Sequence, residues 1–135
     1  MIRQIAPEKF GFTHAQMPCG RPAVLTDLTT EEITLAEMFG VSRENLICCP
    51  ATGDSMVDEG IRENDLLFAD NSLIAKEGDI VLAEIDGEIA VKKIEKKKPY
   101  LLLVSCNSKL NYKPVEPQYN FHVIGVIVGS FRFRR

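Results

Sequence analysis

The sequence predicts a mostly β protein: a twisted antiparallel sheet or partly closed barrel, with one short helix and an extended N-terminal arm. Six short apolar runs follow residue 45, separated by closely spaced turns, and little helical pattern lies between them. Upstream, only residues 27–40 have the apolar spacing and end signals of a helix. We therefore divide the chain into an arm, residues 1–25, and a β-rich domain, residues 26–135.

The arm is interrupted by proline and glycine, which prevent a helical or strand period from developing. These residues are Pro7, Gly11, Pro18, Gly20 and Pro22. The isolated apolar side chains between them cannot form a core of their own. We expect the arm to lie along the surface of a folded domain.

The predicted helix begins near Asp27, Thr29 or Thr30, any of which can cap it, and it ends at Gly40. Two glutamates in its first turn interact favourably with the positive end of the helix dipole, which supports a helix start here. Its apolar residues form a partly amphipathic stripe, made of Ile33, Leu35, Ala36, Met38 and Phe39.

The six apolar runs are the predicted strands: Leu46–Cys49, Asp65–Ala69, Asp79–Ile85, Glu88–Ile94, Tyr100–Cys106 and Phe121–Phe133. The third and fourth runs flank the dipeptide Asp86-Gly87. This dipeptide is typical of two-residue hairpin turns, which need positive φ at both central positions. We therefore expect these two strands to pair as a tight hairpin.

The composition argues against several function classes. The formal net charge of −3 and the pI of about 5.4 give no general reason to expect nucleic-acid or membrane binding. A local basic run, Lys92-Lys93 and Lys96–Lys98, is typical of a solvated strand end and turn.

The four cysteines include no C-x-x-C pair and there are only two histidines, so we expect neither a zinc site nor another cofactor. No signal-peptide core or apolar run of transmembrane length is visible, so we expect a cytoplasmic protein.

The segment Ala51–Gly60, with the sequence ATGDSMVDEG, contains the first candidate for chemistry. Gly53 lets the backbone bend tightly and lets another chain approach closely, and Ser55 follows this turn. Ser55 with Asp58 also fits a helix N-cap that has a carboxylate in the first turn. By itself the segment therefore leaves two interpretations open, a nucleophile and a cap.

Lys92 is the second candidate, on the second strand of the predicted hairpin. With the strand period of two, Lys92 lies between Ala90 and Ile94 on an apolar face, whereas Lys93 shares the other face with Glu95. Such a lysine either extends its amine to water or is buried, and burial lowers its pKa. A neutral lysine is a competent general base for a serine hydroxyl. Neither histidine, His14 or His122, stands in a recognisable triad motif, so lysine is the base we expect if Ser55 is a nucleophile.

Together these segments resemble the LexA/UmuD-type family of self-cleaving serine proteases, peptidase family S24. The similarity covers roughly residues 44 to 130. It rests on Gly53-Asp54-Ser55-Met56, Asp58, Gly60-Ile61, Asp65-Leu66-Leu67, Gly78-Asp79-Ile80-Val81, Asp86-Gly87-Glu88 and Val91-Lys92-Lys93.

The resemblance implies that Ser55 is the nucleophile and that Lys92, the first lysine of its pair, is the base. The backbone N–H groups of Asp54 and Ser55 would then hold the oxyanion. Members of this family cut themselves between a small residue and a glycine in an arm before the catalytic domain, which here implies Cys19-Gly20. Residues 26–135 would then be a catalytic and dimerisation domain.

The resemblance also implies partners: a homodimer, a RecA filament on single-stranded DNA and a UmuC-like polymerase of the Y family. It implies a role in the SOS response to DNA damage, in which the cut form serves translesion synthesis.

Three alternatives share some of these features. A LexA-like or prophage repressor needs a helix-turn-helix, but the first 50 residues contain one predicted helix, so we expect no direct sequence-specific DNA binding. Bacterial signal peptidases have similar motifs but need a membrane anchor. In a non-catalytic β adaptor, Ser55 would be only a cap and Lys92 only a surface charge.

Overall fold

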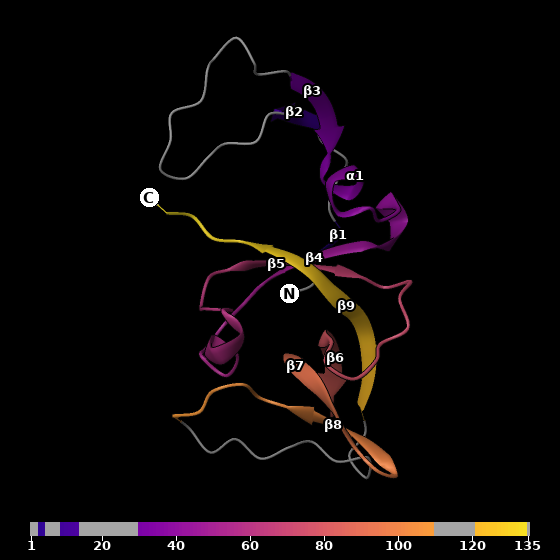
Figure 1. Cartoon of the computed structure of the whole chain (residues 1–135), viewed down its shortest axis with the longest axis vertical. Helices are drawn as coiled ribbons and strands as arrows, with labels where there is room; N and C mark the ends of the chain where they lie inside the picture. The colour runs from indigo at the N-terminus through magenta and orange to yellow at the C-terminus, as the bar shows by residue number, and fades with distance from the viewer. Residues whose placement is uncertain (1–2, 5–8, 14–29, 110–120, 135) are drawn as a thin grey trace.

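The computed structural model of the chain describes residues 3–4, 9–13, 30–109 and 121–134 (Figure 1). Its main element is a seven-stranded sheet in the order β1-β4-β5-β9-β6-β7-β8, and every neighbouring pair is antiparallel. A two-stranded sheet, β2-β3, accompanies it. Within the described ranges β1 and β8 form the two edges of the large sheet, so that sheet is not a closed barrel. The predicted mostly β, antiparallel fold is confirmed.

The strands of the large sheet are β1 (Arg3–Gln4), β4 (Leu46–Pro50), β5 (Leu66–Asp70), β6 (Ile80–Ile85), β7 (Glu88–Lys97), β8 (Tyr100–Val104) and β9 (Phe121–Phe131). The small sheet pairs β2 (Lys9–Thr13) with β3 (Thr30–Thr34). The helical elements are α1 (Leu35–Phe39) and two 3₁₀ turns, η2 (Arg43–Asn45) and η3 (Val57–Glu59). The six predicted strands therefore correspond to β4 to β9, with shifts at their ends.

The hairpin prediction is confirmed in its details. Asp86 has φ 50° and Gly87 has φ 86°, so both central residues of the turn are left-handed. The turn sets the register of β6 on β7, from Ile85 opposite Glu88 to Val81 opposite Lys92. The turn chemistry at one end of the hairpin thus decides where Lys92 lies on the sheet.

The predicted helix over residues 27–40 is wrong over residues 30–34, and residues 27–29 lie outside the described part of the chain. Residues 30–34 form β3, and Thr34 rather than an earlier residue caps α1 through a reciprocal capping box with Glu37. Three of the five β3 residues are β-branched, which favours a strand, and β2 supplies the pairing partner. The end at Gly40 is confirmed, with φ 67° in the left-handed region.

Strand β9 joins the two halves of the large sheet. Its first part pairs with β6 and its last part pairs with β5, so it runs the length of the domain as a long curved strand (Figure 1). On the side of β4 and β5, Phe39 of α1 packs on Phe68, with ring centroids 5.0 Å apart. A Cβ at Gly129 of β9 would lie 2.1 Å from the Phe39 ring, so only glycine fits this contact.

An ion pair between the partly exposed Arg132 and the buried Asp65 joins the residue after β9 to the segment before β5. Asp65 is 1% exposed and accepts two hydrogen bonds of 2.8 Å from the Arg132 guanidinium. The carboxylate also accepts from the Arg62 backbone N–H at 2.9 Å, and Arg132 donates to the Gly60 carbonyl at 2.7 Å. Mainly because of the Arg132 hydrogen bonds, the pKa of Asp65 is lowered to about 2. This network fixes the path of the chain between η3 and β5.

We predict that Arg132→Gln lowers the free energy of unfolding by about 2 kcal/mol, because a buried carboxylate loses its charged donor. The folded-state pKa of Asp65 is depressed, so its contribution is present above pH 4 or so and is lost as the pH falls towards 2. Urea unfolding at several pH values should therefore show a smaller acid loss for Arg132→Gln than for the wild type. Arg134→Gln is the matched control. Equal acid sensitivity of Arg132→Gln and wild type would contradict the prediction.

Candidate active site

Ser55 lies in the irregular turn between β4 and η3, two residues after Gly53, whose φ of 81° needs glycine. The 3₁₀ turn η3 begins after Met56 and has no side-chain cap, so Ser55 is not the helix cap that its spacing to Asp58 allowed. Met56 is 3% exposed and packs in the core with Leu67 and Leu82, which anchors the turn to the sheet. Ser55 itself is half-buried.

A cavity of about 290 Å³ opens beside Ser55. Its walls come from the end of β4, the turn that carries Ser55, and the first half of β7. They are formed by Cys49, Pro50, Ala51, Thr52, Gly53, Ser55, Met56, Ile61, Leu82, Ile89, Ala90 and Val91. Because most of these side chains are small or apolar, the cavity suits an extended peptide with small, uncharged side chains.

Lys92 follows directly on β7 after the cavity residues Ala90 and Val91. Its side chain is half-buried, and Nζ donates a hydrogen bond of 2.6 Å to the Ser105 hydroxyl. Burial lowers the pKa of Lys92 below the usual value for a lysine. A larger fraction of its amine is therefore neutral at a given pH than for an exposed lysine.

Lys93, the next residue, has the opposite environment. Its Nζ lies 2.6 Å from the Glu59 carboxylate, and this hydrogen-bonded ion pair raises the pKa of Lys93. The alternation of the strand therefore separates a lysine with a depressed pKa from one that stays charged. Of the two, only Lys92 combines burial with the protonation behaviour that a general base needs.

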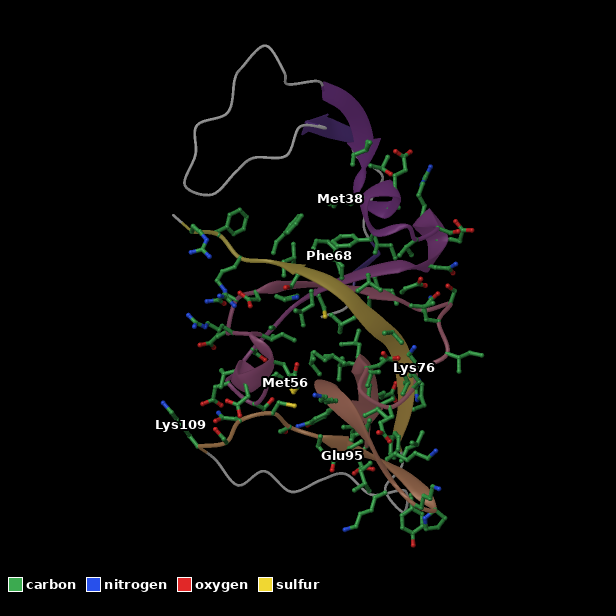
Figure 2. All side chains as sticks on the ribbon, viewed as in Figure 1. Met38, Met56, Phe68, Lys76, Glu95 and Lys109 are labelled. Atoms are coloured by element: carbon green, nitrogen blue, oxygen red, sulfur yellow. The ribbon has the colours of Figure 1, made fainter. Side chains whose placement is uncertain are left out.

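Ser55 and Lys92 both contact the short segment that follows β8. The Cys106 N–H donates to the Ser55 carbonyl at 2.6 Å, while the preceding residue, Ser105, accepts from Lys92. The Asp58 N–H donates to the Cys106 carbonyl at 2.8 Å, which extends the contact along η3. Figure 2 shows Met56 of the turn beside the segment that leads to Lys109. The fold thus places the backbone of Ser55 and the side chain of Lys92 against one segment.

Sequence reasoning missed Ser105 and the two residues that follow it. They stand in no recognisable motif, and their position beside Ser55 depends on long-range pairing of β7 with β8. The predicted cleavage dipeptide, Cys19-Gly20, lies outside the described residues.

Over the described ranges, no group of three or more histidine, cysteine or acidic side chains is arranged to hold a metal ion. No helix in the same part of the chain is long and apolar enough to cross a membrane.

Comparison with known proteins assigns the family. The sequence profile of the Peptidase S24-like family matches residues 12–128. The chain belongs to the Peptidase S24-like family. Within the described residues, this match covers β3 to β8 in full and β2 and β9 in part, and it includes the Ser55 turn and the β6-β7 hairpin of this S24 chain.

The similar curated proteins are LexA repressors. The LexA repressor of Oleidesulfovibrio alaskensis is 33% identical over 113 residues, which cover 84% of this chain and 54% of the relative. The repressor of Carboxydothermus hydrogenoformans is 30% identical over 115 residues, covering 84% and 55%. That of Stenotrophomonas maltophilia is 40% identical over 85 residues, covering 62% and 39%. The S24 chain spans about half the length, or less, of these relatives.

We predict that the two neighbouring lysines titrate on opposite sides of the ordinary lysine pKa. Burial should give Lys92 a lower pKa, and the Glu59 carboxylate should give Lys93 a higher one. NMR titration of the side-chain amines, assigned with single lysine variants, measures both. Glu59→Gln should lower the pKa of Lys93 and leave that of Lys92 unchanged. A pKa of Lys92 at or above that of Lys93 in the wild type would contradict the prediction.

Proposed function

We propose that this S24 chain is a self-cleaving serine endopeptidase in which Ser55 is the nucleophile and Lys92 is the general base. The observation that carries this proposal is the shared segment after β8: Ser105 binds Lys92, and Cys106 binds the backbone of Ser55. The cavity beside Ser55 offers room for an extended substrate. Burial of Lys92 favours the neutral amine that the reaction requires.

In the proposed reaction, the neutral Lys92 amine takes the proton of the Ser55 hydroxyl as Oγ attacks the carbonyl carbon of Cys19. The backbone N–H groups of Asp54 and Ser55 stabilise the oxyanion. Collapse of the tetrahedral intermediate breaks the Cys19–Gly20 bond, and Lys92 returns the proton to the leaving amine of Gly20. Water, deprotonated by Lys92, then hydrolyses the ester at Ser55. The products are residues 1–19 and 20–135.

A tethered substrate is present at a high effective concentration, so an active site of this kind needs restraint. We propose that only a minor population of the uncut protein has the arm and the amine in reacting positions. A RecA filament on single-stranded DNA would increase that population. The cut can come from the same subunit or from the partner of a homodimer.

The role that we propose is UmuD-like. Cleavage at Cys19-Gly20 would convert the chain into the active subunit of a translesion DNA polymerase, a UmuC-like enzyme of the Y family. The protein would act in the cytoplasm as a homodimer during the SOS response to DNA damage. The net charge of −3 gives no general reason for this chain to bind nucleic acid, which favours a protein-binding role.

A second candidate is a LexA-like repressor function. It is favoured by the similarity to LexA repressors over 84% of the chain. In that case the same cleavage would inactivate a repressor rather than activate a polymerase subunit. The Ser55 and Lys92 chemistry is common to both candidates.

We predict slow self-cleavage of the purified full chain at alkaline pH, because deprotonation of Lys92 supplies the base. Mass spectrometry should find a single cut between Cys19 and Gly20. Ser55→Ala and Lys92→Ala should each reduce the rate at least about a hundredfold, as expected for loss of a nucleophile or a general base.

Lys93→Ala is the matched control and should retain cleavage. An intact chain after long incubation, with and without RecA filament, would exclude the protease proposal. Loss of cleavage in Lys93→Ala but not in Lys92→Ala would show that the other lysine is the base.

Two binding measurements separate the UmuD-like from the LexA-like role. We expect the cut form to co-purify with a Y-family polymerase, and we expect the uncut form to show no sequence-dependent DNA affinity in the range of about 10⁻⁸ M typical of specific binders. Specific operator binding that is lost on cleavage would favour the repressor role instead.

A further inference from the structure

The segment Ser105–Asn107 contacts Lys92, the Ser55 backbone and the turn before Ser55, although none of its side chains has a role in the chemistry described above. Ser105 accepts from Lys92, Cys106 donates its N–H to the Ser55 carbonyl, and Asn107 reaches the turn before Ser55. Asn107 is a buried polar residue, 8% exposed. Burying an amide is costly unless it is hydrogen-bonded, and both ends of the Asn107 amide make a hydrogen bond.

Asn107 controls the peptide unit that joins Asp54 to Ser55. Its side-chain Nδ2 donates a hydrogen bond of 2.9 Å to the Asp54 carbonyl. The Val57 N–H donates to the same oxygen at 3.3 Å. This peptide is trans, so its carbonyl and its N–H point in opposite directions. The hydrogen bond from Asn107 therefore turns the Ser55 N–H away from Asn107.

The Ser55 N–H is available for an incoming group. Among the residues that the structure describes, it donates no hydrogen bond to another backbone group. The residues on either side of Asp54, namely Gly53 and Ser55, both line the cavity. An amide held in one orientation at a cavity wall can stabilise an oxyanion without reorganising during the reaction.

Ser105 acts on the amine in a corresponding way. Its hydroxyl accepts one N–H of Lys92 at 2.6 Å, which restricts rotation about the end of a long flexible side chain. When Lys92 is neutral, such a bond fixes the direction of the nitrogen lone pair. A lysine without this contact would sample more rotamers, so its amine would be less precisely positioned for the reaction.

We propose that the segment Ser105–Asn107 is a positioning element of the self-cleavage reaction, in which Asn107 orients the Ser55 amide as an oxyanion donor and Ser105 orients the Lys92 amine. This inference rests on the proposed protease function. It names two positioning residues that sequence reasoning did not find. Because both residues belong to one short segment, the same element would orient the Lys92 amine and the Ser55 N–H.

Asn107→Asp tests the first half of the proposal, because it keeps the shape and the acceptor for the Lys109 N–H but removes the donor to Asp54. The full chain should cleave itself about 10- to 100-fold more slowly at every pH, since the misoriented amide stabilises the oxyanion less. The midpoint of the pH–rate profile is compared in Asn107→Ala, where it should not move, because that variant adds no charge near Lys92. Asn107→Ala, with its melting temperature measured, serves as a second variant in case a carboxylate at this position prevents folding.

Ser105→Ala tests the second half. Loss of the hydroxyl acceptor destabilises the ammonium form, so the midpoint of the pH–rate profile should move to lower pH while the plateau rate falls about tenfold or more. Ser105→Thr keeps the hydroxyl and should restore both the midpoint of the pH–rate profile and the plateau rate to their wild-type values. General loosening of the site would instead hydrate Lys92 and move the midpoint to higher pH, and that result would overturn the proposal.

Asp58→Asn is the matched control, because Asp58 holds the same segment through the Ser108 N–H without touching Ser55 or Lys92. It should leave the rate within about threefold of the wild type. If Asp58→Asn slows cleavage as much as Asn107→Asp, or if neither Asn107 nor Ser105 variants slow it, the positioning role is wrong. If the wild type does not cleave at all, the proposed function itself fails.

Discussion

The turn that carries Ser55 depends on hydrogen bonds to the segment after β8. It has no regular secondary structure of its own before η3, so its backbone groups need partners from elsewhere in the chain. Cys106 supplies both an N–H for Ser55 and a carbonyl for Asp58. On the other side, the Arg132 guanidinium binds Asp65 and the Gly60 carbonyl. The serine is thus held between two parts of the chain that follow it by fifty residues or more.

The alternation of β7 produces the electrostatic asymmetry of the site. Consecutive side chains on a strand point to opposite faces, so two adjacent lysines experience different surroundings. Lys93 reaches Glu59 and remains charged, whereas Lys92 is partly withdrawn from water against Ser105. Burial against Ser105 lowers the pKa of Lys92, because desolvation disfavours the charged amine, whereas the Glu59 carboxylate raises the pKa of Lys93.

Membership of the Peptidase S24-like family and the shared segment after β8 support the same proposal from independent directions. The family match explains why a serine turn and a lysine hairpin occur together. The contacts of Ser105–Asn107 explain how they would be held in register. If the main substrate is the chain's own arm, Ser55 and Lys92 act once per molecule. The contacts that position these two residues would then control whether the chain is cut.

The sequence by itself determined the strand pattern, the Asp86-Gly87 turn and the different surroundings of Lys92 and Lys93, because these follow from local turn chemistry and a period of two. It did not determine that residues 30–34 form a strand. Their apolar spacing predicted a helix, but pairing with β2 stabilises the strand instead. Nor did it reveal Ser105, Asn107 or the Asp65–Arg132 pair, whose partners are 13, 53 and 67 residues away. Only the tertiary structure decides such contacts, because hydrogen bonds between distant residues leave no periodic signal in a single sequence.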